Sequence, residues 1–331
     1  MLISCWAITW WSTFVVASHT QAVLSARYSH YESSTEYFKQ SSLQTDDETF
    51  NVIEDFGLYD QWSWPSLIEH LQHLNEQGDS VVKLFFLQRH GEGFHNIAPN
   101  FYTPAEWNCY WQLQQGNSTV QWLDAELTAN GINEINQIRE AWSHRINMHG
   151  LPIPQSFYVS PLRRTLHTWE LNWKPLLGQE NYDCEKWPIV KEFAREMYGV
   201  GTESKRHNRD YILYNYPFAK FERTFSRFDE LWRPDVHESS HHRKYRCKAL
   251  LDDIFANDGN LIVSLVTHSG LIKSILKVVH HRKFLLKTGQ MIPVVVKRTL
   301  KHHPTKWENP DKVTSWKTVD DYCDKALTGG S

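Results

Sequence analysis

The sequence predicts an α/β protein with a doubly wound sheet, because short apolar segments of strand length alternate with segments of helical periodicity. Residues 81–87 and 261–266 are apolar runs of the kind found in strands that are buried on both faces. A shorter strand is predicted at 157–159 and a last one at 292–296. Helices between these strands would cover both faces of the sheet.

Capping chemistry marks where the helices begin. Pro65 opens a short helix whose apolar residues fall on one face. Thr128 is the predicted N-cap of a longer helix. Ser160 followed by Pro161 has the N-cap and first-position pattern of another. Two further helices are predicted at 244–255 and 271–279.

The spacing of these elements indicates one domain with insertions. Two stretches rich in Trp, Tyr and His, 93–126 and 199–243, lack the strand–helix alternation, so we place them over the end of the sheet that carries the site. The chain then divides into a signal peptide or disordered leader, a flexible N-terminal segment, the domain and a polar C-terminal tail, with the bounds 1–26, 27–60, 61–300 and 301–331.

Composition excludes several classes of protein. The chain has 331 residues, a formal net charge of −3 and 22% charged residues. This balance argues against a disordered tail protein and against a general nucleic-acid binder, which would carry an excess of basic residues. The 15 Trp and 18 His are unusually numerous, and we expect them mainly in the insertions and loops.

The N-terminus favours the secretory pathway or an extracellular location, with a cytoplasmic location as the alternative. No charged side chain precedes Arg27, and the apolar run 5–17 resembles the h-region of a signal peptide. That run is too short to span a bilayer, so no stable membrane insertion is expected. Asn117 begins a glycosylation sequon. Removal of the leader would leave four cysteines, which allow two disulfides in any of three pairings: Cys109, Cys184, Cys247 and Cys323.

Basic and imidazole side chains follow the predicted strands at the point where each strand meets a helix. Arg89 and His90 follow the first strand, and His268 follows the strand 261–266. Arg163 and Arg164 fall in the first turn of the helix that begins near Ser160. Cations there oppose the helix dipole, and a bound anion would remove that conflict. Because ligands of open α/β sheets bind at the carboxyl ends of strands, these residues predict one phosphate-binding crevice.

This set of motifs resembles the histidine phosphatase superfamily, also called phosphoglycerate mutase-like, and within it the fungal phosphomutase-like proteins. The matching segments are Leu-Gln-Arg-His-Gly-Glu at 87–92, Ser-Pro-Leu-Arg-Arg-Thr at 160–165 and Val-Thr-His-Ser-Gly at 266–270. The resemblance runs from about residue 50 to 298. It implies a three-layer α/β/α sandwich with insertions over the active site.

The resemblance also implies a role for each matching residue. His90 corresponds to the nucleophile that becomes phosphorylated, a role that a neutral imidazole can fill. Glu196, in the segment Arg-Glu-x-x-Gly at 195–199, corresponds to the proton donor, although Glu92 and Glu192 compete for that role. The implied catalytic residues are His90, Glu196 and His268, and the implied substrate-binding residues are Arg89, Asn96 and Arg164.

The predicted activity is hydrolysis of a small phosphomonoester without a cofactor or metal. Where the mutases of the family have Ser after Arg-His-Gly-Glu, this chain has Gly93, which favours hydrolysis over a phosphomutase reaction. Two other departures lie in the second insertion: Glu-Ser-Lys-Arg at 203–206 replaces Cys-Asp-Lys-Arg, and His237-Glu238 replaces Arg-Glu. These departures concern substrate specificity, because the insertion is expected to contact the substrate.

Two other functions are alternatives to this predicted hydrolase activity. His237, Glu238 and His241 fit the His-Glu-x-x-His pattern of zinc metallopeptidases, provided that both histidines lie on one face of a helix. A non-catalytic binding module would require a degraded pocket, whereas the Arg and His set is intact. The sequence indicates no nucleic-acid partner and no particular oligomeric state.

Overall fold

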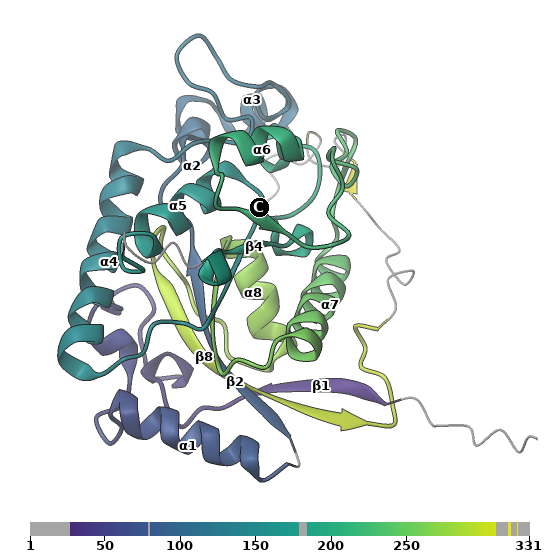
Figure 1. Cartoon of the computed structure of the whole chain (residues 1–331). Helices are drawn as coiled ribbons and strands as arrows, with labels where there is room; N and C mark the ends of the chain where they lie inside the picture. The colour runs from purple at the N-terminus through teal and green to yellow at the C-terminus, as the bar shows by residue number, and fades with distance from the viewer. Residues whose placement is uncertain (1–26, 79, 179–183, 309–316, 319–322, 324–331) are drawn as a thin grey trace, which may run out of the picture.

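The computed structural model describes residues 27–78, 80–178, 184–308, 317–318 and 323 (Figure 1). The predicted leader lies outside these residues. The main sheet has seven strands in the order β1-β8-β2-β7-β3-β4-β5, and β6 pairs with β9 in a second sheet. The strands are β1 Tyr28–Ser33, β2 Val81–Arg89, β3 Ser156–Val159, β4 Ile189–Val190, β5 Lys220–Phe221, β6 Val236–His237, β7 Ile262–Thr267, β8 Met291–Lys301 and β9 Lys317–Thr318.

The centre of the sheet is parallel and one edge is antiparallel. β2 is parallel to β7, with Arg89 opposite Thr267, and β7, β3, β4 and β5 continue in the same direction. β8 runs antiparallel to both β2 and β1. The parallel strands therefore end at one edge, which brings the residues after β2, β3 and β7 together.

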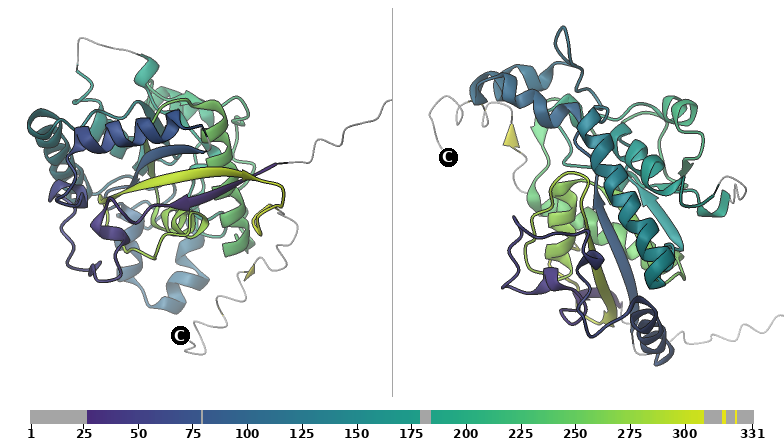
Figure 2. Two further views of the ribbon diagram at one scale, coloured as in Figure 1. Left: turned by 90° about the horizontal axis from the view of Figure 1, so that it is seen from below. Right: turned by 90° about the vertical axis from the view of Figure 1, so that its left-hand side faces the viewer.

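Helices cover both faces of this sheet, which confirms the predicted three-layer α/β/α sandwich. The core on one face includes side chains of α1, α4 and α5, and the core on the other includes side chains of α7 and α8. Figure 2 (left) shows the sheet between α1 and α8. Side chains along β2 alternate between these cores: Leu84 and Phe86 face the first, and Phe85 and Leu87 face the second.

The α-helices of the layers are longer than those of the insertions. In the layers they are α1 Trp64–Glu76, α4 Ala129–His149, α5 Arg163–Trp173, α7 Ser240–Asn257 and α8 Ser269–Val278. The insertions contribute α2 Phe94–Ile97, α3 Pro104–Cys109 and α6 Arg209–Asn215. Short 3-10 helices are η1 Lys39–Ser41, η2 Asp55–Gly57, η3 Ala98–Phe101, η4 Trp111–Leu113, η5 Cys184–Lys186, η6 Glu192–Ala194 and η7 Thr202–Ser204.

The insertions lie where they were predicted, above the carboxyl ends of the strands, with α3 and α6 at the top of Figure 1. The first insertion builds its own small core around Trp122, which is fully buried among aromatic neighbours. Trp was expected mainly in the insertions and loops, but some of it lies elsewhere. Four of the fully buried Trp side chains belong to α1, α4 and α5 of the main core: Trp64, Trp142, Trp169 and Trp173.

Both ends of the domain extend further than the polar composition predicted. The N-terminal segment 27–60 was expected to be flexible, but β1 pairs along β8 from Tyr28 to Ser33, and Phe56 is fully buried. In the predicted polar tail, β8 continues to Lys301 and Trp307 is buried. Most side chains of β1 are polar, and Tyr31 is its one buried residue, so composition alone did not reveal this edge strand.

The helix predicted to begin at Ser160 begins two residues later. α5 starts at Arg163 with Leu162 as N-cap, and Leu162 makes no side-chain capping bond. The Ser160 hydroxyl is not used as a cap because it forms a 2.8 Å hydrogen bond with Nε2 of His268. The predicted Thr128 cap is confirmed, because its hydroxyl accepts the amide of Gly131 at 3.0 Å.

Two glycines allow the loop after β2 to cross the start of α4. A Cβ atom on Gly91 would meet the carbonyl oxygen of Gly131, and one on Gly131 would meet the carbonyl of Glu92. This contact fixes the position of the segment that follows His90.

Cys109, Cys247 and the glycosylation sequon lie within the described part of the chain. Cys109 and Cys247 are free thiols, so the four cysteines do not form the two disulfides that their number allows. Cys247 is fully buried in the α7–α8 core. The Asn117 side-chain amide donates to the Tyr102 hydroxyl at 2.8 Å, so a glycan on this nitrogen would displace an existing hydrogen bond. Within the described ranges, none of the helices combines the length and apolar character that crossing a membrane requires.

Candidate active site

The site is built around His90, directly after β2. Its backbone amide donates to the carbonyl of Thr267 at 3.0 Å, which extends the β2–β7 pairing by one step. The ring is buried, and Nδ1 lies 2.7 Å from the carbonyl oxygen of Gly91. A carbonyl only accepts hydrogen bonds, so Nδ1 carries the proton and Nε2 keeps its lone pair.

Electrostatics keep this imidazole neutral. Burial lowers the pKa of His90 well below its ordinary value, and the nearby guanidiniums of Arg164 and Arg89 lower it further. A neutral ring with a free lone pair on Nε2 is the form that can act as a nucleophile.

Two more histidine rings surround His90. The ring centroid of His268 is 5.1 Å away and that of His95 is 5.2 Å away. His268 is fully buried, its Nε2 contacts the Ser160 hydroxyl, and its Nδ1 has no hydrogen-bond partner among the described residues. Burial and the cation of Arg164 lower the pKa of both rings. His95, in the short helix α2, was not among the site residues predicted from the sequence.

Two guanidiniums approach the same rings without a carboxylate partner. Arg164 is 1% exposed and donates through Nη1 to the carbonyl of Glu203 at 2.8 Å. Arg89 donates through Nη1 to the carbonyl of Leu286 at 2.8 Å. Neither forms an ion pair within the described part of the chain. Because a buried charge without a counter-ion is strongly unfavourable, this arrangement favours the binding of an anion next to His90.

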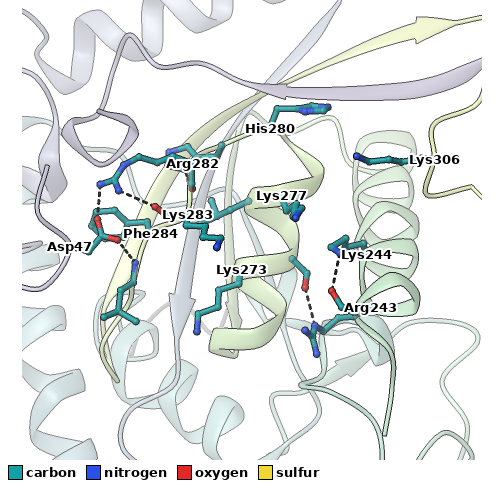
Figure 3. A pocket seen from close by; sticks show the side chains of 15 residues that line it. Asp47, Arg243, Lys244, Lys273, Lys277, His280, Arg282, Lys283, Phe284 and Lys306 are labelled. Carbon is teal, nitrogen blue, oxygen red and sulfur yellow. Dashed lines mark hydrogen bonds and ion pairs between the residues drawn. The ribbon is translucent and has the colours of Figure 1, made fainter. Parts of the chain in front are cut away.

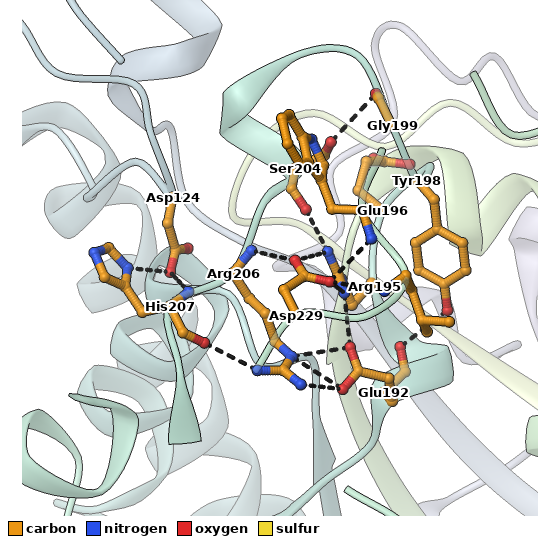
Figure 4. A network of polar contacts seen from close by, with 12 residues as sticks. Asp124, Glu192, Arg195, Glu196, Tyr198, Gly199, Ser204, Arg206, His207 and Asp229 are labelled. Carbon is orange, nitrogen blue, oxygen red and sulfur yellow. Dashed lines mark hydrogen bonds and ion pairs between the residues drawn. The ribbon is translucent and has the colours of Figure 1, made fainter. Parts of the chain in front are cut away.

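Arg163 does not share this pocket. Its guanidinium forms an ion pair with Glu126, and its backbone amide donates to Oδ1 of Asp124 at 2.8 Å. The fully buried Asp124 also bonds Nδ1 of His207 at 2.8 Å. The sequence predicts a bound anion at the start of α5, but a carboxylate of the chain itself lies there. Figure 4 shows Asp124 and His207 side by side.

Asn96 is close to the site but has a structural contact. Its Oδ1 accepts the amide of Gly93 at 2.9 Å, which caps the short helix α2. Phosphate binding by Asn96 stays a prediction that would involve its amide nitrogen.

Three carboxyls were candidates for the proton donor, and the structure separates them. Glu192 forms ion pairs with Arg195 and Arg206 at 2.7 and 2.9 Å. Glu92 accepts the hydroxyl of Thr128 at 2.6 Å, at the start of α4. Glu196 instead reaches the start of α8, where its Oε2 accepts the amide of Gly270 at 3.2 Å.

Glu196 also shares the electrostatic environment of the two unpaired guanidiniums, because its charge acts on both Arg89 and Arg164. Of the three candidates, it is the one placed between these cations and the helix that follows His268.

A fourth carboxyl, missed by the sequence analysis, lies next to Arg164. Burial raises the pKa of Glu203 to about 7, and its Oε2 is buried without a hydrogen-bond partner in the described residues. The sequence departs from the family pattern at 203–206, and Glu203 is the first residue of that departure. This departure was the signal in the sequence that could have identified Glu203 as a residue of the site.

Buried ion pairs hold the segment that carries both carboxyls (Figure 4). Arg195 is fully buried and forms a bidentate ion pair with Asp229, with distances of 2.8 and 2.7 Å. Arg246 of α7 donates to the carbonyls of Phe193, Arg195 and Glu196 at 2.7 to 2.8 Å. The backbone of Glu196 is therefore attached to α7.

The metallopeptidase arrangement is not present. His237 lies in β6 and α7 begins at Ser240, so His237 and His241 do not share a helix face. Glu238 forms an ion pair with Arg246 at 2.6 Å, which occupies the carboxylate. Across the described ranges, no group of three or more His, Cys, Asp or Glu side chains is placed to hold a metal ion.

Comparisons with known proteins agree with this geometry. A family model described as histidine phosphatase superfamily (branch 1) matches residues 85–286. The chain is 41% identical over 295 residues to phosphomutase-like protein 3 of Candida albicans, covering 88% of this chain and 86% of that protein. It is 38% identical over 278 residues to a probable phosphoglycerate mutase of Arthroderma benhamiae, covering 79% and 82%. The crystal structure of phosphoglycerate mutase from Thermus thermophilus is 19% identical, with a TM-score of 0.35, covering 63% of this chain and 91% of that one.

The raised pKa of Glu203 predicts a pH-dependent cost to stability. Between its ordinary pKa of 4.5 and its folded pKa of about 7, the unfolded chain has released a proton that the folded protein still holds. The stability of the wild type therefore falls through this window, whereas a neutral glutamine has no such effect. The free energy of unfolding of Glu203→Gln should rise relative to wild type from pH 4.5 to 7 and then level off.

Urea unfolding at several pH values measures this difference. Glu69→Gln, at an exposed position of α1, is the matched control and should show no such trend. A difference between Glu203→Gln and wild type that stays flat from pH 5 to 7.5 would contradict the burial of an uncompensated carboxyl.

Proposed function

The chain belongs to the histidine phosphatase superfamily, and from this we propose that it is a phosphomonoester hydrolase that acts through a phosphohistidine at His90. One observation carries the proposal: a neutral His90, with its lone pair on Nε2, lies beside the guanidiniums of the fully buried Arg164 and the half-buried Arg89, neither of which forms an ion pair in the described part of the chain. A phosphate monoester supplies the missing negative charge and places an electrophilic phosphorus against the nucleophile.

The first step transfers the phosphoryl group to the enzyme. Nε2 of His90 attacks phosphorus as the bond to the ester oxygen breaks, and negative charge spreads over the equatorial oxygens. Arg89, Arg164 and His268 stabilise that charge, because they are held in place before the substrate arrives. Glu196 donates a proton to the leaving oxygen, so an alcohol departs instead of an alkoxide.

The second step returns the free enzyme. Water attacks the phosphohistidine, its proton passes to the carboxylate that donated one before, and inorganic phosphate leaves. Splitting the transfer in two lowers each barrier, and neither step requires a metal ion or a cofactor.

Hydrolysis is favoured over transfer to a second hydroxyl, although the relatives in Candida albicans and Arthroderma benhamiae carry mutase names. At position 93, a side chain of any kind would collide with the ring of His95, because a Cβ atom there would lie 2.7 Å from Nδ1. The serine that the mutases of the family have at this point cannot be accommodated without moving His95, and this supports the hydrolase.

Replacing the nucleophile should abolish activity. His90→Ala is expected to reduce hydrolysis of p-nitrophenyl phosphate by ~10³-fold or more, because the variant lacks the imidazole that the proposed mechanism phosphorylates. The wild type should form an acid-labile phosphoenzyme that the variant lacks, and its activity should survive EDTA. His73→Ala, on the exposed side of α1, is the control. Unchanged turnover in His90→Ala would overturn the proposal, and loss of wild-type activity in EDTA would contradict metal-free chemistry.

A leaving-group series tests the proton donor. Glu196→Gln keeps an oxygen for the Gly270 amide but has no acidic proton, so hydrolysis of an alkyl phosphate should fall by ~10²-fold. The p-nitrophenyl ester, whose leaving group needs no proton, should lose less than about tenfold. Glu203→Gln is the matched variant. If the strong dependence on the leaving group appears there and not in Glu196→Gln, Glu203 is the donor.

We also propose that the chain enters the secretory pathway, and the apolar run at 5–17 supports this. Expression in a eukaryotic host should deliver the protein to the medium with a new N-terminus near residue 18 or 23, after Ala17 or Ala22. Mass spectrometry of the mature protein measures this. Retention in the cells with the leader intact would contradict it.

A further inference from the structure

A second cationic cavity lies away from the active site, along the outer side of α8 (Figure 3). It has a volume of about 620 Å³ and lies between α8, the first turns of α7 and the segment 280–285. None of its lining residues belongs to the phosphate pocket around His90. α8 begins beside His268, and the cavity follows the later turns of the helix, at Lys273 and Lys277.

The lining carries seven Lys and Arg side chains and a single acid. That acid, Asp47, is already engaged: one oxygen forms an ion pair with Arg282 at 2.6 Å, and the other accepts the backbone amide of Leu285 at 2.9 Å. Within the described part of the chain, the six remaining cations have no ion pair. They are Arg243, Lys244, Lys273, Lys277, Lys283 and Lys306.

Contacts to neutral groups do not offset these charges. Nε of Arg243 donates to the hydroxyl of Ser274 at 2.9 Å, and Nζ of Lys244 donates to the hydroxyl of Ser240 at 2.9 Å. Burial lowers the pKa of Lys244, and three neighbouring cations lower it further. The chain as a whole carries a net charge of −3, so this concentration of positive charge is local. A concave surface of one sign attracts and concentrates ions of the opposite sign.

We propose that this cavity binds a small soluble anion that carries at least three phosphate groups. The cations come from α7, from α8 and from the segments before and after β8, so they surround the cavity on several sides (Figure 3). A single phosphate can contact only some of them, whereas several phosphates on a compact scaffold can contact most. Five of the six unpaired cations are lysines, which bind phosphate as point charges without a fixed two-oxygen geometry.

The size and lining favour a compact ligand over a nucleic acid. About 620 Å³ lies within the range of small-molecule pockets. Single-stranded nucleic acids are held by exposed aromatic rings on which bases stack. Phe284, the phenylalanine of this lining, is 3% exposed and therefore unable to serve as such a platform.

Binding can be tested without interference from turnover. In full-length protein carrying His90→Ala, titration calorimetry with inositol hexakisphosphate should show a site whose affinity falls as salt is added. The further double substitution Lys273→Ala/Lys277→Ala removes two exposed lysines of the cavity and should weaken that affinity by about tenfold or more. The matched control, Lys186→Ala/Lys297→Ala, removes two lysines elsewhere and should change it less than about twofold.

The outcomes separate this proposal from its alternatives. Equal affinity in the cavity variant and its parent would place the ligand elsewhere and overturn the proposal, as would equal weakening by the control. Binding to vesicles of phosphatidylcholine with phosphatidylinositol bisphosphate, without binding to free inositol hexakisphosphate, would assign the site to a membrane headgroup and also overturn it. Because the measurement is binding to an inactive variant, the result is independent of the phosphatase proposal.

Discussion

The pairing of buried arginines with carboxylates is the constraint on which the active site depends. Arg195 and Arg246 are both fully buried, a position that costs several kcal/mol per ion unless partners surround the charge. Arg195 has Asp229 and Glu192, and Arg246 has Glu238 together with three backbone carbonyls of the segment 193–196. That segment has no long helix or strand of its own. It is held by charge, and the position of Glu196 at the start of α8 follows from it.

Arg89 and Arg164 differ from these paired arginines, because neither forms an ion pair within the described residues. All four are removed from solvent to a large extent, but among the described residues only Arg195 and Arg246 form ion pairs with carboxylates. The same physical rule that explains the structural pair therefore supports the proposal that the other pair binds an external anion. The three histidines nearby have lowered pKa values, so they do not add to the positive charge. The result is a pocket with two cations, a neutral imidazole that is the proposed nucleophile, and hydrogen-bond donors.

Sequence reasoning identified the parts of this site that follow one strand or one helix start. The strand before His90, the strand before His268 and the Thr128 cap each depend on neighbouring residues, and all three were predicted. Contacts between distant segments of the chain were not predicted. Nothing near Arg163 in the chain shows that Asp124 would satisfy the start of α5, from 39 residues away. The pKa of Glu203 depends on burial by the fold, and β1 becomes a strand only because β8 offers it an edge. Capping and periodicity are local signals, whereas these features arise from tertiary packing.

The arrangement of charge explains how a mildly acidic protein can select phosphorylated ligands. At physiological salt the Debye length is about 8 Å, so a net charge of −3 spread over the surface has little influence inside a pocket. Inside a pocket, the electrostatic attraction on an anion depends on the few charged side chains that contact it and on whether those side chains already form ion pairs. Within the described chain, both the pocket at His90 and the cavity along α8 have cations left without carboxylate partners, whereas the segment between 192 and 206 has its arginines neutralised. Selectivity for anions therefore depends on which local cations lack a carboxylate partner. The net charge of the chain does not predict this selectivity and does not counteract it.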